Sequence, residues 1–277
     1  MASRLTCLLR LTPVLAVFLG LQPALAGSVA LATYRAVHDL VIDPASEAPD
    51  IGTMTGRMVV EFSGSDCAGY KTTTRFVTAS EDGDGARQVV DARSVIFETN
   101  DGRFDFDNQT YEDEGLSDSS KGTAERGAGG VTVTLTEPAR KTLELSADVV
   151  FPTEQLTRII EAARAGDRFL SFSAYDAIDA GETVSPTTVV IGAESTASAD
   201  VGVETAIADA GYATLLHWPV TVSYFDKGPG IDQAPTYTLS AILYDNGIMR
   251  QLKLNYGRFT LLGKLVQLDT LPKTPCE

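Results

Sequence analysis

Short runs in which apolar and polar residues alternate recur along most of the chain, and this repetition constrains the fold more than any other feature. In residues 70–78, for example, Tyr70, Thr72 and Phe76 share one side of an extended chain. A period of two is typical of a strand with one buried face. Such runs occupy residues 33–42, 54–62, 70–78, 87–98, 103–111, 121–125, 131–136, 168–175, 183–191, 215–225, 236–244, 248–256 and 258–268.

Turn-forming segments separate these runs. Asn246-Gly247 lies between two alternating runs and is the strongest hairpin signal, and glycine-rich turns occur at residues 81–85, 100–102 and 127–130. Successive hairpins place neighbouring strands antiparallel. The sequence therefore predicts an all-β fold, an antiparallel meander or open barrel, and excludes a parallel α/β sheet.

The period changes once, in residues 152–165. Leu156, Ile159, Ile160 and Ala163 recur at the spacing of one helical stripe, which predicts an amphipathic helix. We expect Thr153 to cap its first turn and Gly166 to end it. The helix is expected to plug the end of the β structure, and a binding element is the alternative.

Residues 27–277 are expected to form a single β unit, or two β halves, about 27–150 and 167–277, joined by this helix. Length alone does not choose between one large domain and two small ones. Residues 192–211 are rich in Ala, Ser, Thr, Asp and Gly and offer little to bury. This segment is interpreted as a mobile loop or a boundary.

Residues 1–26 have the pattern of a cleaved secretory signal peptide. Arg4 and Arg10 form a positively charged first region, and residues 11–21 are almost wholly apolar. Ala24 and Ala26 are small residues at the positions that a signal peptidase reads, so cleavage is expected after Ala26. The alternative, a retained membrane anchor, is disfavoured because the apolar run is shorter than the roughly 20 residues that a spanning helix needs. After cleavage we expect no membrane-spanning segment.

The charge of the chain excludes two classes of partner. The formal net charge is −15, from 22 basic and 37 acidic residues. Loss of Arg4 and Arg10 with the signal peptide would leave 20 basic residues and a net charge of −17. Such a surface repels nucleic acid and anionic lipid headgroups.

Two cysteines, Cys67 and Cys276, would remain after signal cleavage, because Cys7 belongs to the signal peptide. Export delivers them to an oxidising compartment, where an intramolecular disulfide is expected. Two free buried thiols and an intermolecular bridge are the alternatives. A redox-active role is disfavoured because the chain has no Cys-x-x-Cys pair.

A search for catalytic or metal-binding residues finds no motif. The two histidines, His38 and His217, fall within predicted strands, and no Gly-x-Ser-x-Gly elbow accompanies them. The acidic stretches at residues 81–85 and 112–114 do not follow the calcium-loop pattern, and the glycine-rich stretches lack a phosphate-binding lysine. We therefore expect no catalytic residues, cofactor or metal, and a non-enzymatic protein.

Several ordered segments carry a family resemblance that spans residues 31–276. They are YRAVHDL (34–40), TGRMV (55–59), CAGY (67–70), RFVT (75–78), FPTEQL (151–156), TVVIG (188–192), PVTVSYF (219–225), LYDNG (243–247) and PC (275–276). In number and order these segments resemble the EipB family of periplasmic cell-envelope integrity proteins of alphaproteobacteria.

The resemblance implies a β-spiral, an open antiparallel structure similar to the Lol-type lipoprotein carriers. It also implies a disulfide between Cys67 and Cys276, a periplasmic location, resistance to envelope stress, and a periplasmic tetratricopeptide-repeat protein as a partner. It transfers no catalytic residues. The 193–211 segment looks variable.

Two functions follow as expectations. The first is a scaffold or protein-binding module that maintains envelope integrity, because an open barrel leaves strand edges for pairing. The alternative is a periplasmic carrier or binder of lipid or lipoprotein acyl chains, which rests on analogy of fold.

Overall fold

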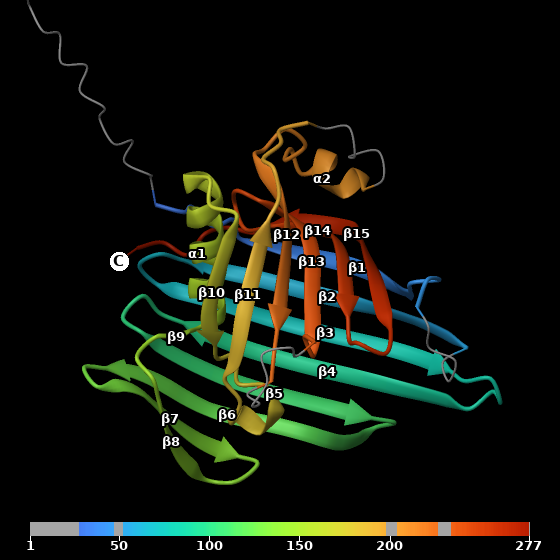
Figure 1. Cartoon of the computed structure of the whole chain (residues 1–277), viewed down its shortest axis with the longest axis horizontal. Coiled ribbons are helices and arrows are strands. Elements are labelled where there is room, and N and C mark those ends of the chain that lie inside the picture. The colour runs from blue at the N-terminus through green and yellow to red at the C-terminus, as the bar shows by residue number, and fades with distance from the viewer. Residues whose placement is uncertain (1–27, 47–51, 198–203, 227–233, 277) are drawn as a thin grey trace, which may run out of the picture.

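A computed structural model describes residues 28–46, 52–197, 204–226 and 234–276. The chain is mostly β, as the alternating runs predict (Figure 1). The expected signal peptide lies outside the described residues. The elements are β1 (Tyr34–Ile42), β2 (Thr53–Ser65), β3 (Gly69–Glu81), β4 (Arg87–Glu98), β5 (Arg103–Glu112), β6 (Gly115–Gly127), β7 (Gly130–Glu137), β8 (Lys141–Leu145), β9 (Val149–Val150), α1 (Pro152–Ala165), β10 (Phe169–Ala174), the 3-10 turn η1 (Asp179–Gly181), β11 (Ser185–Ile191), α2 (Thr205–Asp209), β12 (His217–Tyr224), β13 (Tyr237–Tyr244), β14 (Met249–Asn255) and β15 (Thr260–Thr270).

All of the strands join one sheet in the order β8-β7-β6-β5-β4-β3-β2-β1-β15-β14-β13-β12-β11-β10-β9. Each neighbouring pair is antiparallel except β9 with β10. The first and last strands, β1 and β15, pair in the middle, so the two edges are β8 and β9, which follow one another in the chain. The sheet is therefore a nearly closed, barrel-like structure with one gap.

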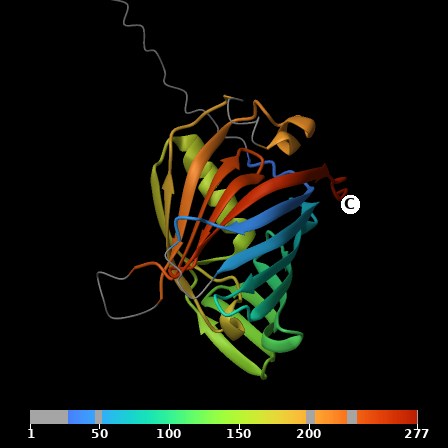
Figure 2. The same ribbon diagram turned by 90° about the vertical axis from the view of Figure 1, so that its right-hand side faces the viewer.

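The sheet bends so that its two halves face each other. In Figure 1 the strands of the C-terminal half run steeply across those of the N-terminal half, and Figure 2 shows the two halves diverging from one side. The larger core lies between them and combines Leu40 and Phe62 of β1 and β2 with Val222, Leu243 and Leu254 of β12 to β14. Burial of alternate residues from both halves explains the period of two in the sequence.

Helix α1 covers one end of this core, as expected of a plug. Its buried stripe consists of Ile159, Ile160, Ala162 and Ala163. The expected end at Gly166 is confirmed: this residue has a φ of 86° and its N–H bonds the carbonyls of Ala162 and Ala163. Within the described residues, α1 and α2 are the α-helices, and neither is long and apolar enough to cross a membrane.

The expectation that Thr153 caps α1 is wrong. The N-cap position is Phe151, which makes no side-chain cap, and Pro152 begins the helix. The carboxylate of Glu98, at the end of β4, instead accepts the N–H groups of Thr153 (2.8 Å) and Glu154 (2.9 Å). The cap comes from the end of β4, so the residue type and position of Thr153 were not sufficient to identify it.

The prediction of a mobile loop or boundary at residues 192–211 is wrong where the structure describes it. Ser195 forms a β-bridge with His217, and α2 buries Ala206 and Ile207 against the sheet. Residues 198–203 lie outside the described part. The predicted strand at 121–125 is also too short, since β6 begins at Gly115, where apolar residues do not alternate.

Candidate functional site

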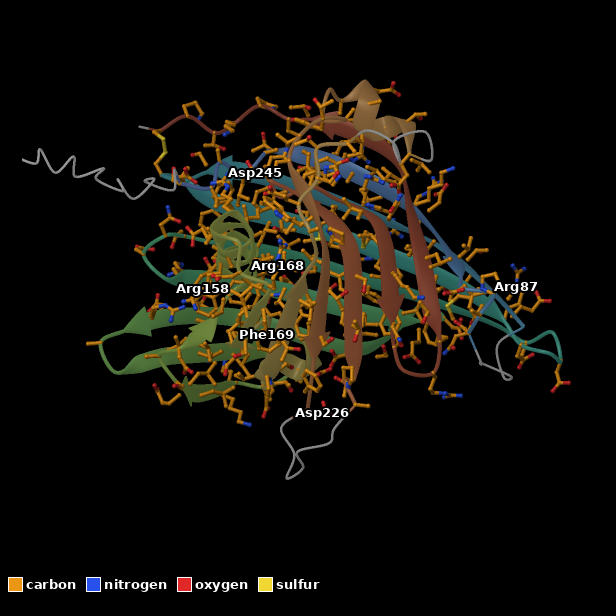
Figure 3. The ribbon with its side chains drawn as sticks, turned by 45° about the horizontal axis from the view of Figure 1, so that its top comes forward. Arg87, Arg158, Arg168, Phe169, Asp226 and Asp245 are labelled. Carbon is orange, nitrogen blue, oxygen red and sulfur yellow. A yellow bond between two sulfur atoms is a disulfide. The ribbon has the colours of Figure 1, made fainter. Side chains whose placement is uncertain are left out.

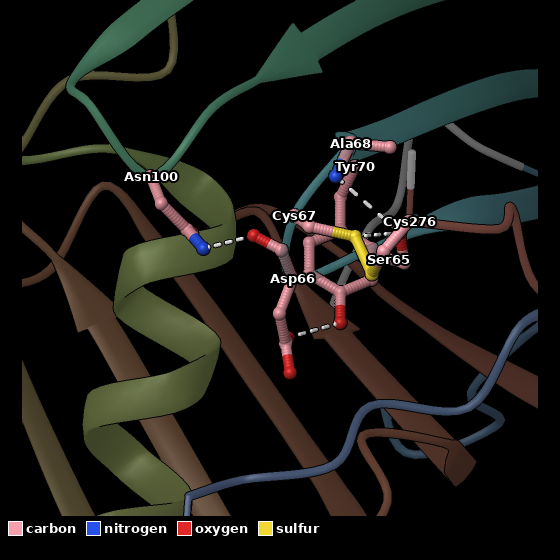
Figure 4. The surroundings of a disulfide bond; sticks show 7 residues. All are labelled: Ser65, Asp66, Cys67, Ala68, Tyr70, Asn100 and Cys276. Carbon is pink, nitrogen blue, oxygen red and sulfur yellow. Dashed lines mark hydrogen bonds between the residues drawn. A yellow bond between two sulfur atoms is a disulfide. The ribbon is translucent and has the colours of Figure 1, made fainter.

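A disulfide between Cys67 and Cys276 fastens the C-terminal tail to the turn between β2 and β3 (Figure 4). The two Cα atoms are 5.6 Å apart, in the ordinary range for a disulfide. The tail also bonds the chain near β1 and β2, because Thr33 Oγ1 donates to the Leu271 carbonyl (2.6 Å) and the Thr274 N–H donates to the Gly64 carbonyl (3.2 Å). This arrangement holds structure and offers no reactive thiol.

The same turn is tied to the turn between β4 and β5. Tyr70 Oη donates to Asp66 (2.6 Å), and the side-chain amide of Asn100 donates to the Asp66 carbonyl (Figure 4). A pocket of about 570 Å³ lies between this turn and α1. Glu98 lines it, and burial raises the pKa of its carboxyl, partly offset by the two N–H groups it accepts. The acids and arginines of this pocket largely bond one another or the helix, as the bonds of Arg126 and Arg158 to Glu154 show.

The inner face of the sheet carries a row of aromatic rings, which we call the aromatic ladder: Tyr224, Tyr237, Tyr256 and Phe259. Successive ring centroids are 5.8, 5.0 and 5.1 Å apart. The register explains the first step, since Tyr224 of β12 pairs with Tyr237 of β13. Rings at these separations attract one another beyond the burial of their area.

The aromatic ladder crosses one end of the C-terminal half of the sheet, from the end of β12, beside α1, to the turn between β14 and β15. At the α1 end, Gln155 Nε2 donates to Tyr224 Oη (2.8 Å), and burial raises the pKa of Tyr224 to about 12. At the far end, Tyr256 and Phe259 flank the turn between β14 and β15, and Tyr256 remains 38% exposed. The aromatic ladder thus leads from the packed core to an opening of the sheet beside the turn between β14 and β15, which we call the mouth.

The facing wall of this mouth comes from β2, β3 and β4. A groove of about 510 Å³ lies between this wall and the outer end of the aromatic ladder. Figure 3 places Arg87, a rim residue, at the end of the molecule away from Arg158 of α1. The apolar lining consists of Met54, Phe76, Val90, Tyr256, Phe259 and Leu261, and the polar rim includes Ser80, Glu81, Asp82, Arg87, Gln88 and Arg258.

Several apolar residues along the inner face are only partly buried. Met58, Phe76, Tyr224 and Leu239 pack against the main core without being enclosed by it. The rim carries two acids and two arginines, so it favours neither sign of charge strongly. An apolar groove with a polar rim is the form of site that binds an apolar chain while leaving a polar end in water.

A buried ion pair anchors α2 to the sheet. Arg250 is fully buried, Glu204 is 1% exposed, and their charged atoms are 3.5 Å apart. Glu204 Oε1 also accepts the N–H groups of Leu265 (2.7 Å) and Gln251 (3.3 Å), the latter at a β-bulge where φ is +51°. This ion pair anchors the end of the 192–211 segment that the sequence analysis interpreted as a mobile loop or a boundary.

The two histidines lie in strands, as predicted, and each bonds a backbone carbonyl. His38 Nε2 is 3.3 Å from the Met249 carbonyl oxygen, and His217 Nδ1 is 2.8 Å from that of Leu215. Burial lowers the pKa of His38 to about 4. Among the described residues, no three His, Cys, Asp or Glu side chains are placed to hold a metal ion.

Sequence reasoning identified the cysteines but missed the groove. Tyr224, Tyr237 and Tyr256 each follow the strand alternation, which signals an inward face. Their assembly depends on the order of strands and on the turn at Phe259, which alternation does not reveal. Glu204 was missed because it stands in a segment without apolar periodicity.

Comparisons with known proteins give a consistent result. A family model described as EipB-like matches residues 25–272. The cell envelope integrity protein EipB of Brucella abortus is 38% identical over 245 residues, which cover 88% of this chain and 86% of that protein. The crystal structure of a β-barrel-like protein of a domain of unknown function from Brucella abortus superposes with a TM-score of 0.81 at 36% identity, covering 88% of this chain and all of that one.

Proposed function

The chain belongs to the EipB-like family, and from this membership we propose that it is a non-enzymatic periplasmic protein that maintains envelope integrity. It does so by binding an apolar chain, such as a lipid or lipoprotein acyl chain, in the groove at the mouth of the sheet. The similarity to a cell envelope integrity protein supports the cellular role. The expected signal peptide supports the periplasmic location.

The observation that carries the choice of ligand is the aromatic ladder that opens into the groove. Its outer rings, Tyr256 and Phe259, face Phe76 and Met54 across the groove. Unoccupied, this surface leaves apolar area in contact with water, which costs about 25 cal/mol for each Å². A bound acyl chain would remove that contact, and its polar end would stay at the rim beside Arg87.

A pair of adjacent substitutions tests the proposal. Val90 lines the groove, whereas Val89 points to the other face of β4 and is 42% exposed. Val90→Trp should fill the groove and weaken binding of dansyl-undecanoic acid at least tenfold, whereas Val89→Trp should leave binding unchanged. Displacement of the probe by myristoyl lysophosphatidylcholine is expected. Equal binding by both variants would refute the groove as the site.

A second candidate function is docking to another envelope protein. The observation that favours it is the edge of the sheet at β8, where no backbone hydrogen bond to the free side is found among the described residues. Strand edges of this kind accept an extended segment of a partner. A tetratricopeptide-repeat protein remains one proposed partner. Cross-linking in the envelope tests the docking function.

A further inference from the structure

The two edges of the sheet differ in how they are covered. Beside β9, the guanidinium of Arg126 donates to the carbonyls of Ala147 (2.6 Å) and Val149 (3.0 Å) and lies over the ring of Phe151. This side chain occupies backbone acceptors at the edge, as proteins commonly do to prevent strand addition. At β8, the described residues provide no equivalent side chain.

The hydrogen-bond alternation identifies which groups of β8 are free. The hairpin between β6 and β7 has a two-residue loop, so its flanking pair, Gly127 and Gly130, is hydrogen-bonded and the next pair, Arg126 and Val131, is not. The Arg126 N–H indeed bonds Gly102 on the opposite side. The N–H and C=O groups of Val131 therefore point toward β8, where Val131 pairs with Leu145.

The same alternation, continued along β8, directs the N–H and C=O groups of Thr142 and Glu144 away from β7. These two residues pair with Thr134 and Thr132 across the sheet, and both are exposed. An antiparallel strand added at this edge would therefore meet two donors and two acceptors at the spacing that it requires.

The side chains at the edge define what such a strand must carry. On the inner face, the buried row Phe104, Ala124 and Val133 continues to Leu143, which is only half buried because no strand lies beyond it. On the outer face, Glu144 is exposed and bonds only Thr132 among the described residues. A fitting strand alternates apolar residues with basic or hydroxyl residues.

We propose that β8 is a docking edge for an extended segment of another envelope protein, with apolar residues beside Leu143 and Leu145 and a lysine or arginine beside Glu144. This inference rests on the second candidate function above. A second copy of this chain is disfavoured as the occupant because each copy would carry a net charge of −17 after signal cleavage. A five-residue edge also falls short of the roughly 1,200–2,000 Å² of a stable interface.

A synthetic peptide, Thr-Val-Lys-Val-Lys-Val-Thr, labelled with fluorescein, tests the edge directly. Thr142→Pro removes an N–H that points away from β7, so the sheet keeps its own bonds, whereas Thr142→Ala removes only the side chain. We expect the peptide to bind the wild type and Thr142→Ala alike, and to bind Thr142→Pro at least tenfold more weakly. Tryptophan fluorescence would show that each variant is folded.

Two further comparisons distinguish backbone pairing at β8 from nonspecific binding of the peptide. The same peptide with methyl groups on the backbone nitrogens of its lysines keeps its charges and loses the N–H donors that would face β8, and it should bind at least tenfold more weakly. Glu144→Lys should weaken binding of the lysine peptide and strengthen binding of a peptide with glutamate in place of the lysines. Unchanged binding of the N-methylated peptide, or of Thr142→Pro, would overturn the proposal, as would a wild type that binds no peptide or forms a β8-dependent dimer.

Photo-cross-linking in the envelope tests two claims separately: that the protein docks to another envelope protein, and that β8 is the docking edge. A photoreactive residue at Ser146, next to β8, should yield a cross-linked species that disappears with Thr142→Pro. If a species persists with Thr142→Pro, docking occurs elsewhere and only the edge assignment is overturned. If none forms at Ser146 or at exposed Val190 on the outer face of β11, the docking function is overturned as well.

Discussion

Reduction of the disulfide between Cys67 and Cys276 should lower the free energy of unfolding by an amount set by the loop that it closes. The cysteines are 209 residues apart. The chain-entropy relation for a loop of that length gives about 5 kcal/mol, as an upper value because a compact unfolded chain has less entropy to lose. Against a typical stability of about 5–15 kcal/mol, this is a large share.

The loss should act through the unfolded state. The tail keeps its bonds from Thr33 to Leu271 and from Thr274 to Gly64 without the disulfide, and β1 stays paired with β15. We therefore expect reduced protein to retain the native fold at low denaturant and to unfold at a lower urea concentration, by about 2 M for a slope of about 2–3 kcal/mol per M.

The assay is urea unfolding followed by fluorescence of Trp218, which is fully buried. Oxidised and reduced wild type are compared with Cys67→Ser, Cys276→Ser and the double variant. The three variants should share one midpoint, equal to that of the reduced wild type, because the two residues act as a unit. Additive losses in the double variant, or a midpoint that reductant does not move although thiol titration shows the bond is cleaved, would refute the reasoning.

Three other predictions concern buried polar groups. Because burial lowers the pKa of His38 to about 4 from an unfolded value near 6.5, the wild type should lose up to about 3 kcal/mol relative to His38→Gln as the pH falls between these values; parallel stability curves for the two proteins would contradict this. Glu98→Ala leaves two N–H groups at the start of α1 without their acceptor and should cost about 1–3 kcal/mol in urea unfolding, and a change below the experimental error would show that the cap is dispensable. Glu204→Gln leaves Arg250 buried without its counter-charge and should cost about 3–5 kcal/mol, with increased proteolysis near α2; a cost under about 1 kcal/mol would argue against the ion pair.

Local patterns in the sequence predicted the elements well. The stripe from Leu156 to Ala163 gave helix α1, and Gly166 gave its end, since both depend on neighbours within one or two turns. The turn at Asn246-Gly247 likewise joins β13 and β14, where Gly247 has a φ of 88°. Such features need only the chain close to them.

Long-range contacts were not accessible in the same way. Glu98 caps a helix that begins more than 50 residues later, and Glu204 meets Arg250 through a bulge whose position no local pattern reveals. The aromatic ladder depends on which strands become neighbours, and alternation specifies a face without specifying a neighbour. The edge at β8 was missed because its five residues contain too few alternations to stand out.

The central claim, that the groove binds an apolar chain, is tested most directly by native mass spectrometry of protein isolated from the envelope. The account predicts one acyl-chain molecule for each protein, retained in Val89→Trp and absent from Val90→Trp. Wild-type protein without any bound apolar molecule, or with the same molecule bound equally by Val90→Trp, would contradict it.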